Sequence, residues 1–98
     1  DILEETADAV VSVADEDAVA MMRRLADPSF GDPLIVAGES AVAGLAALMA
    51  IAGHAEARDA IGLTEDSRVM LFGTEGDTDA ELYTKLIGRS GDDVRNAA

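Results

Sequence analysis

Two glycine-containing turns carry the residues whose types and spacing could do chemistry. The first is Gly38-Glu39-Ser40, and the second begins at Gly73-Thr74. Each turn follows a short apolar run and precedes apolar residues at helical spacing, which is typical of a strand leading into a helix. In open α/β sheets, ligands bind outside the carboxyl ends of the strands. We therefore expect these two turns to contribute to a small-molecule site.

A structural role is the alternative for these residues and their neighbours. Ser40 is an ordinary N-cap candidate, because its hydroxyl could accept a hydrogen bond from a first-turn amide. For the three carboxylates Glu75, Asp77 and Asp79 we favour helix capping and complementarity to the helix dipole. An EF-hand-like cation loop needs a longer set of oxygen ligands with a distal Glu. The sequence has no cysteine and a single histidine, His54, so we expect no metal site.

The elements that must position the turns alternate between strand and helix. Apolar runs predict strands at 10–13, 34–37 and 68–72. Helical spacing, acidic starts and glycine ends predict helices at about 15–27, 41–52, 55–61 and 79–87. This order indicates parallel strands with helical crossovers, an α/β fold with a three-layer αβα arrangement. Three strands are few for such a sheet, so we expect further strands from elsewhere.

The charge of the chain excludes some partners. The formal charge of −13 comes from 20 acidic and 7 basic residues. Because such a surface repels phosphates, we expect neither a nucleic acid nor an anionic membrane as a partner. The acidity fits a halophilic source as well as an ordinary acidic surface. The apolar run at 41–52 is shorter than the roughly 20 residues of a membrane span, and we expect a cytoplasmic protein.

The length allows one small domain at most, residues 1–98. Aromatic residues are scarce, namely Phe30, Phe72 and Tyr83, so the core must consist of small aliphatic residues and is expected to be thin. The segment from 89 to 98 has no apolar face, and we expect a frayed tail there.

Two segments together resemble a known enzyme family. They are the residues GESAVAGL at 38–45 and RVMLFGTEGDTD at 68–79. They are similar to the C-terminal portion of the diaminopropionate ammonia-lyases, a branch of the tryptophan-synthase-β-like, fold-type II enzymes that use pyridoxal 5'-phosphate (PLP). ADAVVSV at 7–13 and MMRRL at 21–25 fit the same family, and the resemblance runs from about residue 7 to 87.

The resemblance implies that residues 1–98 are part of the large, PLP-binding domain. Gly38, Glu39 and Ser40 would then lie beside the cofactor ring, and Gly73 and Thr74 at its pyridine nitrogen. The two turns would be neighbouring walls of one cofactor pocket. The lyases usually have Ser-Thr-Glu-Gly at the second turn, and here Gly73 stands at the serine position. The hydroxyl contact would therefore fall to Thr74 or to a water.

The activity implied is β-elimination from an amino acid such as 2,3-diaminopropionate, giving pyruvate and ammonia. The family's Schiff-base lysine, phosphate loop and acid/base carboxylates lie N-terminal to the matched part, and Lys85 stands outside any such motif. We therefore expect no catalytic residue in these 98 residues and no activity of the chain alone. Its expected partners are the missing N-terminal portion, an amino-acid substrate and a second copy of the parent in a homodimer. The alternative is a non-catalytic α/β binding or oligomerisation module.

Overall fold

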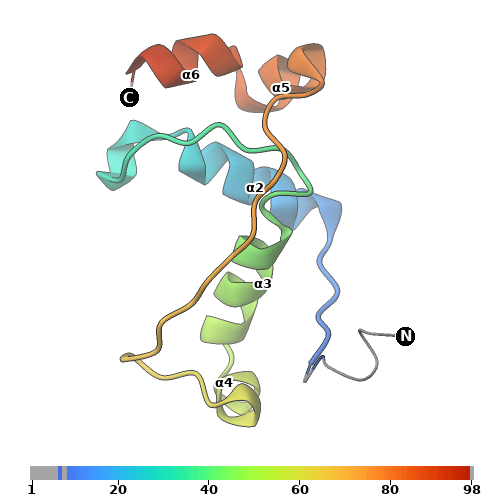
Figure 1. The fold of residues 1–98 in the computed structure, drawn as a ribbon, viewed down its shortest axis with the longest axis vertical. Coiled ribbons are helices and arrows are strands. Elements are labelled where there is room, and N and C mark those ends of the chain that lie inside the picture. The colour runs from blue at the N-terminus through green and yellow to red at the C-terminus, as the bar shows by residue number, and fades with distance from the viewer. Residues whose placement is uncertain (1–6, 8, 98) are drawn as a thin grey trace.

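The chain is built from short helices joined by long extended segments (Figure 1). A computed structural model describes residue 7 and residues 9–97, so that residues 1–6, 8 and 98 of the expected domain lie outside it. The helices are α2 (Asp15–Leu25), the 3₁₀ turn η1 (Pro28–Phe30), α3 (Ala43–Ala52), α4 (Ala55–Ile61), α5 (Ala80–Ile87) and α6 (Gly91–Ala97). The described part of the chain contains no β-strand.

The predicted α/β fold with a parallel sheet is therefore wrong for the described residues. The segments 10–13, 34–37 and 68–72 are not helical, but none is assigned as a strand. A strand requires neighbours that satisfy its backbone donors and acceptors. Figure 1 shows the segments before α2 and before α5 running apart from each other, so they cannot form a ladder. Met70 and Phe72 are 79% and 82% exposed, although an apolar run was expected to be buried.

Helix α2 forms where local signals agree. Its first turn carries Asp15, Glu16 and Asp17 and its last turn carries two arginines, which complements the helix dipole at both ends. Ala18 and Met22 are buried on one face. The neighbouring arginine, Arg23, donates from Nε to the Leu86 carbonyl of α5 at 2.8 Å. Helix α2 is thereby fixed against α5.

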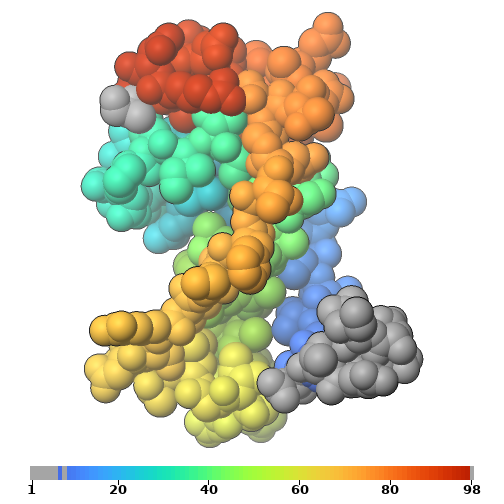
Figure 2. Space-filling view, viewed as in Figure 1, coloured from blue at the N-terminus to red at the C-terminus, as the bar shows by residue number. Residues whose placement is uncertain are grey.

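Helix α3 is apolar around most of its circumference and packs against α2 and α4. Ala46 is its buried residue, and Met49 remains exposed. The extended segment before α5 crosses the helix closely, because an added Cβ at Gly44 would lie 3.2 Å from Leu71 Cδ2. Figure 2 shows this segment lying on the surface along its length.

The C-terminal segment differs from the frayed tail expected at 89–98. Helix α5 ends at Gly88, which adopts the left-handed conformation with φ of 85°, a conformation that favours glycine. Helix α6 follows at once and starts with the Asp93 amide donating to Ser90 Oγ at 3.1 Å. Val94 is fully buried. A single apolar side chain therefore anchors this helix, which sequence periodicity could not reveal.

The core is small, as its composition predicted. Its buried apolar residues are Ala18, Met22, Ala26, Ala37, Val42, Ala46, Tyr83 and Val94. Half of them are alanines, so little apolar area is buried per residue. None of the helices that the structure describes is long and apolar enough to cross a membrane.

Candidate functional site

The two turns singled out by the sequence lie against each other. The Gly38 amide donates to the Glu75 carbonyl at 2.9 Å, and the Ser40 amide donates to Glu75 Oε1 at 3.0 Å. These bonds connect residues 35 or more positions apart. The two turns are therefore neighbours in the fold, as predicted. Whether they hold a cofactor stays a prediction.

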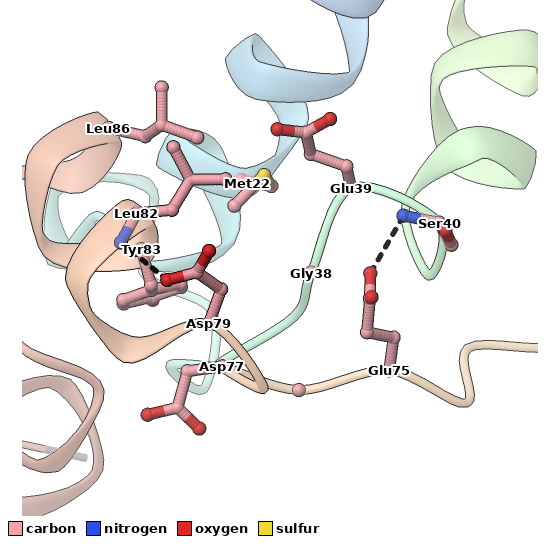
Figure 3. A pocket seen from close by; sticks show the side chains of 11 residues that line it. Met22, Gly38, Glu39, Ser40, Glu75, Asp77, Asp79, Leu82, Tyr83 and Leu86 are labelled. Carbon is pink, nitrogen blue, oxygen red and sulfur yellow. Dashed lines mark hydrogen bonds between the residues drawn. The ribbon is translucent and has the colours of Figure 1, made fainter.

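A cavity of about 200 Å³ lies between these turns and two helices (Figure 3). Its polar wall consists of Gly38, Glu39, Ser40, Glu75, Gly76, Asp77 and Asp79. Its apolar wall consists of Met22 from α2 and Leu82, Tyr83 and Leu86 from α5. One side of a small molecule placed there would contact hydrocarbon, and the other side would contact carboxylates and backbone amides.

The structure brings only part of the predicted site into this cavity. Gly38, Glu39 and Ser40 line it, whereas Gly73 and Thr74 do not. An added Cβ at Gly73 would lie 3.3 Å from the Ala41 carbonyl oxygen, so Gly73 packs against the chain that follows the first turn. Thr74 is exposed and directly precedes Glu75, which does line the cavity.

Two residues of the apolar wall are among the most deeply buried that the structure describes. Met22 and Tyr83 are 3% and 2% exposed. The Tyr83 hydroxyl is buried and has no hydrogen-bond partner among the described residues. Burial, followed by the negative charge of Asp77, raises the pKa of the Tyr83 phenol above its ordinary value. Tyr83 therefore stays neutral at physiological pH.

Three of the four carboxylates on the polar wall have defined partners. Glu75 accepts from the Ser40 amide, and Asp79 caps α5 by accepting from the Leu82 amide at 3.1 Å. Asp77 is paired with Arg95 of α6. The hydrogen bond from Arg95 lowers the pKa of the Asp77 carboxyl. The capping role predicted for the three carboxylates is thus confirmed for Asp79, whereas Glu75 and Asp77 have other partners.

Glu39 is the carboxylate of this wall that has no hydrogen-bond partner within residues 9–97. In Figure 3 its side chain points away from Ser40 and toward the side of the cavity formed by Met22 and Leu82. A carboxylate beside an apolar wall favours ligands that present a cationic or hydrogen-donating group next to hydrocarbon.

The N-cap role considered for Ser40 is not the one observed. Helix α3 begins at Ala43, its N-cap is Val42, and no side chain caps it. The backbone amide of Ser40 is bound instead by the Glu75 side chain. The importance of Glu75 was missed because its partner is distant in sequence. Its position beside Gly76 in a turn was the only local signal.

No group of acidic or histidine residues in the described part of the chain is arranged to hold a metal ion. Three of the four carboxylates of the polar wall are bound by backbone amides or by Arg95.

Comparison with known proteins finds that the chain is similar to one kind of enzyme. No family model matches the chain, and no solved structure matches it. The similar proteins are ammonia-lyases. They are the curated diaminopropionate ammonia-lyases of Escherichia coli strain K12, strain O6:H1 and strain O157:H7, each 34% identical over 90 residues. The resemblance to this enzyme is confirmed. The match covers 89% of this chain, which spans 23% of the length of those relatives.

Proposed function

We propose that this chain is the C-terminal portion of a PLP-dependent ammonia-lyase that converts an amino acid such as 2,3-diaminopropionate to pyruvate and ammonia. The observation that carries the proposal is the 34% identity over 89% of the chain to diaminopropionate ammonia-lyase. It is supported by the contact between the two turns, since Gly38 and Ser40 both bond to Glu75. These are the turns whose residues resemble that family.

The residues present fit one edge of a flat heteroaromatic ring. Gly38 packs directly against the second turn, because a Cβ at this position would lie 2.6 Å from the Gly76 carbonyl oxygen. Met22 and Tyr83 supply an apolar wall that excludes water on the opposite side. Glu39 and Ser40 would line the ring edge. Thr74, or Gly73 through its backbone, would reach the pyridine nitrogen from the rim.

The polar wall of the cavity does not fit the phosphate of the cofactor. Glu39, Glu75, Asp77 and Asp79 line the cavity, and their charges repel an anion. The phosphate must therefore be bound by residues outside this chain. PLP, when bound, supplies the electron sink for an amino-acid carbanion. The contribution of this chain is to orient the ring and to exclude water.

The proposed role also requires a partner. Lys85 lies exposed on α5 and does not line the cavity, so no lysine of this chain is placed to attach the cofactor. The extended segment at 68–72 exposes Met70 and Phe72 to solvent, and such apolar surface favours contact with another part of the protein. The N-terminal portion of the parent would supply the lysine, the phosphate site and this contact, in a homodimer.

The proposal is tested by assaying pyruvate from 2,3-diaminopropionate with the full-length protein and with the 98-residue chain. We expect PLP-dependent pyruvate formation by the full-length protein and none by the chain alone. Failure of the folded full-length protein to release pyruvate from this substrate would contradict the proposal. That outcome, with a cooperatively unfolding isolated chain, would favour the non-catalytic binding module.

The role of Thr74 is tested separately in the full-length protein by Thr74→Val. Thr78→Val is the matched control, because Thr78 is an exposed threonine of the same loop that does not line the cavity. We expect weaker PLP binding in the Thr74 variant only. Equal PLP affinities of both variants and the wild type would assign the pyridine contact to another group.

A further inference from the structure

Glu75 joins the two turns through both its backbone and its side chain. Its carbonyl accepts from the Gly38 amide at 2.9 Å. Its Oε1 accepts from the Ser40 amide at 3.0 Å. Figure 3 shows the Glu75 side chain reaching from the second turn to the start of the chain that leads into α3. One residue therefore fixes both ends of the Gly38-Glu39-Ser40 turn.

The side-chain bond stabilises a helix entry that has no cap of its own. Val42 is the N-cap of α3, and no side chain accepts from the first-turn amides. Backbone N–H groups near a helix start favour a nearby carboxylate. Hydrogen bonds to a charged acceptor are about twice as strong as neutral ones. Glu75 supplies such an acceptor to the Ser40 amide, two residues before the N-cap, from a distant part of the chain.

Gly38 is the residue that makes room for the Glu75 carboxylate. A Cβ at position 38 would lie 2.6 Å from Glu75 Cδ and closer still to Oε1. Gly38 does not have a positive φ, so the space it leaves, rather than its conformational freedom, accounts for the glycine. Gly38 and Glu75 are thus complementary, and a change in either one displaces the Glu39-Ser40 segment.

We propose that Glu75 is a positioning residue, which holds Glu39 and Ser40 at the edge of the cavity so that they can contact the bound ring. Its effect on the ring rests on the proposed function. Its hold on the Ser40 amide does not depend on that function. The two claims are tested separately, by measuring hydrogen exchange of the Ser40 amide and the affinity for the cofactor.

The first measurement is hydrogen–deuterium exchange of the full-length protein, resolved to single amides by fragmentation in the mass spectrometer. We compare Glu75→Ala and Glu75→Gln with Glu65→Ala, in which an exposed glutamate outside this cavity is removed. Glu75→Ala should speed exchange of the Ser40 amide about tenfold or more. Glu75→Gln retains an oxygen acceptor and should restore part of the protection.

The Gly38 amide is an internal control for these variants, because it donates to the backbone carbonyl at position 75 and not to the side chain. Its exchange should change little in Glu75→Gln. Unchanged exchange of the Ser40 amide in Glu75→Ala would overturn the positioning role.

The second measurement is the PLP dissociation constant of the same proteins, followed by absorbance. We expect about a tenfold rise in Glu75→Ala, a smaller rise in Glu75→Gln and none in Glu65→Ala. A freed Ser40 amide with unchanged PLP affinity would overturn the effect of Glu75 on the ring. If the wild type binds no PLP while Glu75→Ala still speeds exchange of the Ser40 amide, the proposed function is wrong. The hydrogen bond between the two turns is then still supported.

Discussion

Replacing Gly38 with alanine should disrupt the contact between the two turns. An ideal Cβ at this position would lie 2.6 Å from the Gly76 carbonyl oxygen and 2.6 Å from Glu75 Cδ. Real Cβ atoms essentially never approach other heavy atoms within 3.0 Å, so at least two groups must move. The Glu75 carboxylate can rotate away, but the backbone carbonyl of Gly76 can move only with its turn.

The magnitude follows from these two displacements. Overpacking by one carbon at a rigid contact costs about 1–3 kcal/mol. Rotation of the Glu75 side chain would also break its hydrogen bond with the Ser40 amide, which adds about 1 kcal/mol. We therefore expect Gly38→Ala to lower the free energy of unfolding by about 2–4 kcal/mol.

The assay is urea unfolding followed by circular dichroism, with Gly76→Ala as the matched control. Gly76 lines the same cavity, has no positive φ, and an added Cβ there would meet nothing within 4 Å. We expect Gly76→Ala to stay within about 0.5 kcal/mol of the wild type. Equal stabilities of the two variants would refute the account of how Gly38 and Glu75 fit together.

Three further predictions concern the core and the Asp77–Arg95 ion pair. Arg95 lowers the pKa of the Asp77 carboxyl. The stability that the ionised carboxylate contributes is therefore present above its ordinary pKa of 3.8 and is lost as the pH falls through the lowered value. In acid unfolding, Arg95→Ala should lose less stability than the wild type. Met22→Ala should lower the free energy of unfolding in urea by about 2–5 kcal/mol, whereas the exposed Met49→Ala should cost less than about 1 kcal/mol. Tyr83→Phe removes a buried hydroxyl that has no hydrogen-bond partner within the described residues. Urea unfolding should therefore show a stability equal to or higher than that of the wild type. A decrease in the free energy of unfolding above about 1 kcal/mol would show that the hydroxyl has a partner.

The helices were predictable because their signals are local. The predicted helix at 55–61 coincides with α4, and the predicted start at 79 is the capping residue Asp79 of α5. Apolar spacing, caps and terminal charges lie within a few residues of the helices that they define. The exception is α6, whose stability depends on Val94 being buried against distant residues.

The strands were not predictable for the opposite reason. Apolar runs at 10–13, 34–37 and 68–72 have the composition of strands, but a strand exists only where another backbone pairs with it. In the described chain, Ile35 donates to the Leu25 carbonyl at the end of α2, and no ladder forms. The composition of these runs correctly indicated an extended backbone. It could not indicate whether another backbone segment lies beside them to pair with.

The contact between the two turns was predicted from the resemblance to a family and not from spacing. Gly38, Glu39 and Ser40 line the cavity as expected, while Gly73 and Thr74 do not. The apolar wall was partly foreseeable, since Leu82, Tyr83 and Leu86 repeat at helical spacing. The pairing of Asp77 with Arg95 could not be foreseen because it depends on where α6 docks.

The two walls of the cavity set limits on how a ligand could lie in it. The carboxylates repel the phosphate end of a cofactor, and Tyr83 remains neutral because burial raises the pKa of its phenol. The apolar residues Met22 and Leu86 face the acidic turns across the cavity. Because of these charges, a ring placed between the walls would direct an anionic substituent outward, away from the carboxylates. Under the proposed function the acidic wall would orient the ring as well as contact it, which would be a reason for Glu75 to hold the Glu39-Ser40 segment in a fixed position.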